Sequence, residues 1–233
     1  MPLDKQAIDT LSGVSTATLT TVMLKLGLRN IWVRGARPTV PGRARIVGPA
    51  FTLRFVPNRE DLATPESWSS PKSSRAAIEE MPEGCVVVVD AMGVRDSAIV
   101  GDILCARMRK LAVVALVTDG VVRDLRGVIG TGLPVWCNGA AAPPSIAALT
   151  FVDWQQPVAC GGIAVIPDDI IVADDDGAVL IPNAFLDQVL SAAPEQEQLE
   201  DWIMQEVQNG AALPGLYPIN EENAARYKKS RLG

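Results

Sequence analysis

The chain has 233 residues, of which 48% are hydrophobic and 21% are charged, so it is long and apolar enough to bury a large core. Its formal net charge of −6 argues against nucleic acid as a partner, because nucleic-acid-binding proteins present a basic surface. The chain contains no histidine, which excludes His-dependent nucleophiles and His-ligated zinc.

The N-terminal segment MPLDKQAIDT lacks the basic and apolar regions of a signal peptide. The longest apolar runs, such as residues 111–117, are too short to cross a bilayer. The four cysteines are widely spaced in apolar stretches, without the spacing of a metal site or a disulfide framework. We therefore expect a cytoplasmic protein with reduced thiols and no membrane partner.

The first third of the chain contains helix and strand signals. Ser15 or Thr16 can cap a helix that runs over residues 17–26 and ends at Gly27. Strand signals follow over residues 31–56, and residues 57–73 form a polar loop rich in Pro and Ser. Loops of this length in compact domains are often functional, so this one is a candidate substrate loop.

A helix over about 74–81 precedes the apolar strand CVVVVDA at residues 85–91. A second helix, Asp102–Lys110, leads directly into a strand at Leu111–Val117, and several short strands follow up to residue 182. The remainder, about 184–233, is a helical tail interrupted at Pro194 and stopped at Gly210. Early alternation of strands and helices, followed by clustered strands, predicts a single α/β sandwich domain over 1–233.

Two short motifs occupy the ends of one helix–strand unit. A helix that leads directly into a strand reverses direction, so the end of the strand returns to the edge where the helix began. Gly101-Asp102 and the segment 119–124, DGVVRD, should therefore lie close together in space.

Such an edge suits an anionic ligand and a metal ion. The helix start offers free N–H groups from Asp102 to Leu104, and Gly101 allows close approach of a ligand. Arg123 can bind carboxylate or enolate oxygens in a fork, and Asp124 is a hard oxygen ligand suited to Mg²⁺. Asp102 could hold a metal-bound water and pass protons. The plain alternatives are a helix N-cap at Gly101-Asp102 and a surface ion pair at Arg123-Asp124.

The motifs VGDIL…TDGVVRD, CVVVVDAMG and GGIAVIPDDIIVADDDGAVLIP resemble the 4-hydroxy-4-methyl-2-oxoglutarate / 4-carboxy-4-hydroxy-2-oxoadipate aldolase family. That family also contains RNase E activity regulators and some oxaloacetate decarboxylases. The resemblance covers roughly residues 10–210. It implies a three-layer β/β/α swivelling-type sandwich that assembles as a homotrimer or hexamer, with sites between subunits.

The resemblance also implies a class II pyruvate aldolase mechanism. The pyruvyl carboxylate would lie on Gly101, Asp102, Ile103 and Leu104. Arg123 would stabilise the enolate and Asp124 would reach the metal, while a Glu of the helical tail, Glu197 or Glu200, would enter the neighbouring subunit's site. The regulators typically lack the Asp of the Arg-Asp pair, so Asp124 favours a lyase.

We therefore predict a carbon–carbon lyase that depends on Mg²⁺ or Mn²⁺ and releases pyruvate from a 4-hydroxy-2-oxo acid, with oxaloacetate decarboxylation as a side activity. The catalytic residues would be Arg123 and Asp102. The alternative is a non-catalytic trimer that binds a ribonuclease complex. The loop over 57–73 does not match the short PGDN-type segment of characterised aldolases in the family, so we expect this loop to influence substrate choice.

Other polar motifs have simpler explanations. The run Asp174–Gly177 and the pair Asp168-Asp169 are typical of turns, and Gly161-Gly162 lacks the Gly-Lys-Ser/Thr of a phosphate loop. Glutamates of the tail would form a solvated helix face. Five N-terminal arginines are expected to be surface or intersubunit charges, although one of them could bind a second substrate carboxylate: Arg29, Arg34, Arg37, Arg43 and Arg45.

Overall fold

The computed structural model describes residues 3–231, so residues 1, 2, 232 and 233 of the predicted domain lie outside the described range. The helices are α1 (Lys5–Ser12), α2 (Thr16–Lys25), α3 (Ser74–Glu79), α4 (Asp102–Lys110), α5 (Leu125–Gly130), α6 (Leu186–Gln208) and α7 (Glu221–Ser230). The strands are β1 (Arg37–Pro38), β2 (Ile46–Pro57), β3 (Val86–Asp90), β4 (Ala115–Thr118), β5 (Val135–Cys137), β6 (Leu149–Trp154), β7 (Ile170–Asp174) and β8 (Gly177–Ile181).

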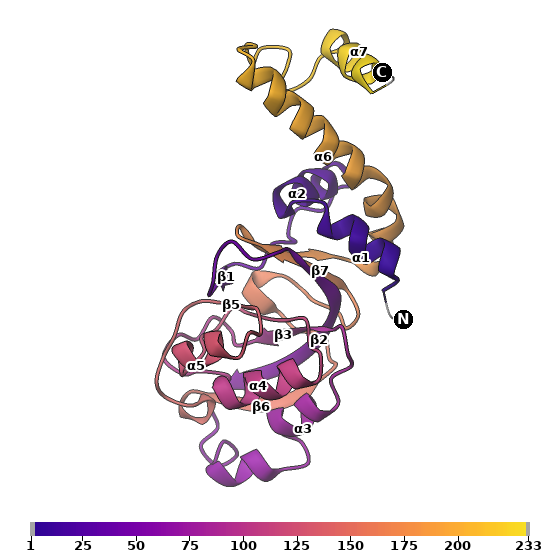
Figure 1. The fold of residues 1–233 in the computed structure, drawn as a ribbon. Coiled ribbons are helices and arrows are strands. Elements are labelled where there is room, and N and C mark those ends of the chain that lie inside the picture. The colour runs from indigo at the N-terminus through magenta and orange to yellow at the C-terminus, as the bar shows by residue number, and fades with distance from the viewer. Residues whose placement is uncertain (1–2, 232–233) are drawn as a thin grey trace.

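Strand β2 connects two sheet regions because it is long enough to pair with three neighbours. Its first part pairs antiparallel with β7, and its later part pairs parallel with β3 and antiparallel with β6. The strand order is β1-β5-β4-β3-β2-β7-β8, and β2 to β5 run parallel within it. The result is a strongly curved, nearly closed sheet (Figure 1).

The valine run of β3 shows how the sheet divides two cores. Val87 and Val89 face the core beneath α3, α4 and α5, whereas Val86 and Val88 face the interior between the two sheet regions. Alternate residues of a strand point to opposite faces, so a strand buried on both sides is apolar throughout. A third core lies between the β7–β8 hairpin and helices α1, α2 and α6 (Figure 1).

The predicted α/β sandwich is confirmed, with a further helical layer of α1, α2 and α6 over β7–β8. Ser15 caps α2 as predicted, accepting a hydrogen bond from the N–H of Thr18. The acidic run after β7 forms the β7–β8 hairpin turn, as predicted. All four cysteines are buried and free, and burial raises the pKa of the Cys85 and Cys105 thiols to about 12, which keeps them protonated at neutral pH.

Three predicted boundaries differ from the structure. The strand predicted from Leu111 begins at Ala115, because Leu111 ends α4 and Ala112 takes a left-handed conformation with φ of 58°. Residues 31–40 form only the two-residue strand β1 and an isolated bridge at Trp32. Pro194 does not interrupt the tail helix, since α6 continues through it.

Helix α6 begins against α1 and α2 and then extends away from the body toward α7 (Figure 1). Within residues 3–231, no helix combines the length and the apolar character needed to cross a membrane.

The carboxylate of Asp119, directly after β4, joins three segments of backbone. It accepts hydrogen bonds from the N–H groups of Ala91 (2.9 Å), Gly93 (3.0 Å) and Gly161 (3.1 Å). Two of these donors follow β3, and the third belongs to the connection before β7. Asp119 is buried, and so are its hydrogen bonds to Ala91 and Gly161, whose N–H groups would lose their acceptor if the carboxylate were removed.

We expect Asp119→Ala to lower the free energy of unfolding by about 3 kcal/mol, because it leaves buried N–H groups without acceptors. Urea unfolding followed by circular dichroism measures this change. Asp96→Ala is the matched control, since Asp96 is exposed in the loop after β3. Equal stability of the two variants would contradict the role given to Asp119.

Candidate functional site

The two predicted motifs meet at one edge of the sheet. The N–H of Ile99 donates to the carbonyl of Val121 (3.0 Å), and the N–H of Arg123 donates to the carbonyl of Val100 (3.0 Å). These bonds hold residues 98–100 and residues 121–123 side by side. The predicted proximity of Gly101-Asp102 to Arg123-Asp124 is therefore confirmed.

Gly101 is the N-cap of α4 and lies directly against the Arg-Asp pair. A Cβ at this position would be 3.0 Å from Asp124 Oδ2 and 3.1 Å from Arg123 Cγ. Its φ of −125° is in the extended region, so glycine is needed here for space rather than for backbone conformation. The helix start and the two side chains are thus packed as closely as the backbone allows.

The first turn of α4 keeps donors available. Asp102 Oδ1 accepts from the N–H of Ile103 (2.8 Å), so that donor is already used. Within residues 3–231, the N–H groups of Asp102 and Leu104 have no hydrogen-bond partner. They add to the partial positive charge of the helix N-terminus, which favours an anion.

Arg123 and Asp124 form an ion pair, with 3.0 Å between Arg123 Nε and Asp124 Oδ2. Their side chains remain 40% and 48% exposed, so the pair is open to a ligand. Asp124 occupies the N-cap position of α5 in a left-handed conformation (φ 53°) but makes no side-chain cap bond. Its carboxylate is therefore turned away from capping and toward Arg123. The alternative of a surface ion pair is correct in that Arg123 and Asp124 are paired and partly exposed, but the pair also lines a cavity.

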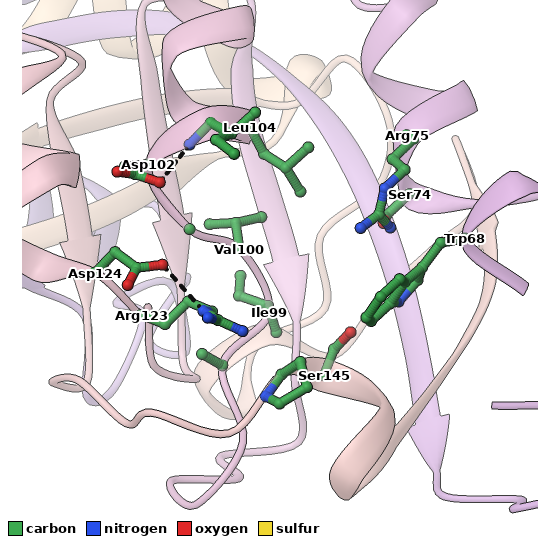
Figure 2. Close-up of a pocket in the computed structure, with 14 residues that line it drawn as sticks. Trp68, Ser74, Arg75, Ile99, Val100, Asp102, Leu104, Arg123, Asp124 and Ser145 are labelled. Carbon is green, nitrogen blue, oxygen red and sulfur yellow. Dashed lines mark hydrogen bonds and ion pairs between the residues drawn. The ribbon is translucent and has the colours of Figure 1, made fainter. Parts of the chain in front are cut away.

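That cavity has a volume of about 400 Å³, at the small end of the range for metabolite sites. Figure 2 shows Arg123, Asp124 and Asp102 on one side, Ile99 and Val100 across the floor, and Arg75 with Trp68 on the opposite side. All of the predicted substrate-binding residues line it: Gly101, Asp102, Ile103, Leu104 and Arg123.

The sequence analysis missed the opposite wall. Trp68 lies in a short 3₁₀ helix (Pro65–Ser69) inside the predicted substrate loop, and Ser74 and Arg75 begin α3. Ser145 comes from the connection between β5 and β6. The length and polarity of the 57–73 loop were the only signal for this wall, and they did not identify its residues.

Glu197 and Glu200 lie outside this cavity. Glu197 Oε2 accepts from the N–H of Ser15 (3.1 Å), and Glu200 Oε2 accepts from the hydroxyl of Thr18 (2.9 Å). Both glutamates thus contact α2 of their own chain, and the expected solvated face is wrong for these two residues. Their entry into a neighbouring subunit's site stays a prediction.

A cation in this cavity would have few protein ligands. Within residues 3–231, no three side chains among Cys, Asp and Glu gather closely enough to enclose a cation. Mg²⁺ commonly binds through one or two carboxylates and keeps several waters, so the half-exposed carboxylate of Asp124 in a polar cavity fits this ion.

The known proteins that this chain resembles include an aldolase and members of the RraA family. Residues 16–180 match the RraA-like family, described as Aldolase/RraA. A putative 4-hydroxy-4-methyl-2-oxoglutarate aldolase from Halalkalibacterium halodurans is 31% identical over 66% of this chain and 67% of its own length. Protein DlpA of Legionella pneumophila is 29% identical over 72% of this chain, which spans only 26% of DlpA.

The fold of this chain is also similar to that of solved structures. RraAS2 of Streptomyces coelicolor, titled an unusual member of the RNase ES inhibitor RraA protein family, is 33% identical, with a TM-score of 0.77 over 87% of this chain and 97% of its own. A protein from Pseudomonas syringae pv. tomato is 26% identical, with a TM-score of 0.79 over 93% of this chain and 99% of its own.

Gly101→Ala is expected to weaken the binding of pyruvate about tenfold or more, because its Cβ would displace Asp124 and Arg123 from the start of α4. Stability should change by less than about 1 kcal/mol, since alanine is only a weaker N-cap. Calorimetric titration with pyruvate in the presence of Mg²⁺ tests the affinity, and urea unfolding tests the stability.

Gly130→Ala provides the control, because a Cβ at Gly130 meets no atom within 4 Å. Wild-type affinity in Gly101→Ala would show that the ligand does not depend on this packing.

Proposed function

This chain belongs to the RraA-like family of aldolases and RraA proteins, and from that membership we propose that it is a divalent-metal-dependent pyruvate aldolase. It would cleave a 4-hydroxy-2-oxo acid and release pyruvate. The observation that supports this most is the meeting of the α4 N-terminus, Arg123 and Asp124 in one cavity.

The carboxylate end of the substrate would bind at the helix start. The N–H groups of Asp102 and Leu104 have no partner in the described chain and are available to it, and Gly101 allows Arg123 and Asp124 to lie beside them. Arg123 would leave part of its contact with Asp124 and direct its fork at the 2-oxo oxygen, where negative charge develops as the carbon–carbon bond breaks.

Asp124 would hold Mg²⁺ or Mn²⁺, with waters completing the coordination. When bound, such an ion acts as a Lewis acid toward the 2-oxo group. The carboxylate of Asp124 thus has two partners, Arg123 and the cation, and its half-exposed position allows both contacts.

Proton transfer would involve Asp102, because the chain has no histidine. A water held by Asp102 would take the proton of the 4-hydroxyl group while the bond between carbons 3 and 4 breaks and its electron pair moves toward the 2-oxo oxygen. Return of a proton to carbon 3 gives pyruvate. Loss of carbon dioxide from oxaloacetate forms the same enolate, so oxaloacetate decarboxylation would be a side activity.

A non-catalytic regulator that binds a ribonuclease complex is the second candidate. The likeness to RraAS2 at 33% identity favours it. The two candidates differ in metal dependence. Pyruvate release from a panel of 4-hydroxy-2-oxo acids, measured with and without EDTA, separates them. Release that EDTA abolishes supports the lyase, and no release from any member of the panel contradicts it.

Two single substitutions should separate the roles of Arg123 and Asp124 in that assay. Asp124→Asn should weaken metal binding and abolish turnover, with little rescue by excess Mg²⁺ or Mn²⁺. Arg123→Lys should leave metal affinity nearly unchanged but lower kcat by about a hundredfold or more, because lysine keeps the charge and loses the planar fork.

Asp96→Asn, which removes an exposed carboxylate outside the cavity, serves as the charge control. The assignment is wrong if Asp124→Asn keeps wild-type rate and metal dependence, or if Arg123→Lys loses the metal rather than the rate.

We also propose self-association as a trimer or hexamer. The part of α6 that extends from the body, and the segment after it, expose the large apolar side chains of Met204, Leu213 and Tyr217, each more than half exposed. Contact with another copy would remove this apolar surface from water.

Light scattering at micromolar concentration should therefore give three or six times the monomer mass, and Met204→Glu should shift the protein toward smaller species. A monomer mass for the wild type would refute the assembly. It would also remove any role of Glu197 or Glu200 in a neighbouring site.

A further inference from the structure

Arg75 and Trp68 form the wall of the cavity opposite Arg123 and Asp124 (Figure 2). The guanidinium carbon of Arg75 lies 4.7 Å from the centre of the Trp68 ring. Arg75 is on the first turn of α3 and Trp68 is on the preceding loop, so the contact ties the loop to the helix.

Arg75 has no acidic partner. Within residues 3–231 its guanidinium makes no ion pair and no hydrogen bond, whereas Arg123 pairs with Asp124 and Arg107 pairs with Glu79. Partial burial lowers the pKa of Arg75, and burial is the only cause acting on it. A charged side chain is thus partly desolvated at the cavity wall, and within the described residues its only compensating contact is with the Trp68 ring, with no hydrogen-bond acceptor for its N–H groups.

The groups around Arg75 are donors rather than acids. The hydroxyls of Ser74 and Ser145 line the same half of the cavity, and neither donates a hydrogen bond to another group in the described part of the chain. The two carboxylates of the cavity, Asp102 and Asp124, lie on the other side (Figure 2). This half therefore presents positive charge and hydroxyl groups to whatever occupies it.

A purely structural role is the simplest alternative, since a guanidinium on an indole ring stabilises a loop by itself. That contact, however, leaves the guanidinium without a hydrogen-bond acceptor, since Arg75 makes no hydrogen bond within residues 3–231. The N–H groups lie at the edges of the plane and remain free, and a carboxylate binds such an edge through two parallel hydrogen bonds. Contact with Trp68 would restrict the orientation of the fork for such a ligand.

We propose that Arg75, oriented by Trp68, binds the second carboxylate of a 2-oxo diacid whose oxo-acid end lies at Arg123 and the α4 N-terminus. The inference rests on the proposed function for the position of the oxo-acid end. It makes Arg75 the residue that selects diacids over monoacids, and it explains how the 57–73 loop would influence substrate choice.

Calorimetric titration in Mg²⁺ with 2-oxoadipate and 2-oxohexanoate tests this selection directly. The two probes have the same carbon chain and differ by one terminal carboxylate, and neither has the 4-hydroxyl group needed for cleavage. Wild-type protein should bind 2-oxoadipate about tenfold or more tightly than 2-oxohexanoate, the effect of one charge-assisted hydrogen-bonded pair. Arg75→Gln should bring this ratio close to one by weakening the diacid alone, and Arg75→Lys should give an intermediate ratio.

Arg109→Gln is the matched control, because it removes the same charge from an exposed position of α4 outside the cavity and should keep the wild-type ratio. Equal wild-type affinity for the two probes overturns the inference. Equal weakening of both probes by Arg75→Gln also overturns it, since Arg75 would then only fasten the loop. Failure of the aldolase proposal is a different result, namely preserved diacid selectivity without pyruvate release from any hydroxy-oxo acid.

Discussion

The carboxylate of Asp119 fixes the edge of the sheet on which the rest of the site depends. Its three backbone hydrogen bonds hold the segments after β3 and β4 and the connection before β7 in one arrangement. Burial raises the pKa of Asp119, while the N–H donors act in the opposite direction, so the three bonds offset part of the cost of burying the group. The next residue, Gly120, passes so close to Ala91 that a Cβ would lie 2.5 Å from the alanine Cβ. The chain from Asp119 to Asp124 consequently has little freedom, and Arg123 and Asp124 arrive at the α4 N-terminus as a fixed pair.

The ligand proposed for the cavity is an anion, and an acidic protein must create positive potential for it locally, because its overall field repels anions. The cavity does so with the α4 N-terminus and Arg123 on one side and Arg75 on the other. Asp124 offsets part of this charge through its pair with Arg123. A bound cation would compete for Asp124 and release Arg123 toward the ligand, so metal and anion would support each other's binding.

Local sequence patterns predicted the parts of the site whose position follows from chain direction. Helix α4 has the predicted bounds, Asp102–Lys110, and the reversal into β4 correctly brought Gly101 beside Asp124. Arg75 and Trp68 could not be found in this way, because no repeat or motif marks them and only tertiary packing brings them to the same cavity as Ser145. Asp119 was included in the DGVVRD motif, but its role depends on N–H groups 26 to 42 residues away, which local patterns do not reveal. The apolar run at residues 85–91 predicted strand β3. The extra layer of α1, α2 and α6 was not predicted, because it depends on which face of the sheet these helices cover.

The two ends of the cavity differ in how firmly they are tied to the fold. Arg123 is bonded through its backbone to the 98–100 segment, next to strand ends that Asp119 holds in place. Trp68 belongs to a loop in which Ala63 and Ser73 are the only buried residues of 57–73, so few apolar contacts fix it. Changes in the loop would alter the distal half of the cavity at little cost to stability, whereas changes near Asp119 would disturb the core and the reactive end together. A rigid end for the common oxo-acid group and an adaptable end for the variable part of the substrate would allow one fold to change substrate while it retains its chemistry.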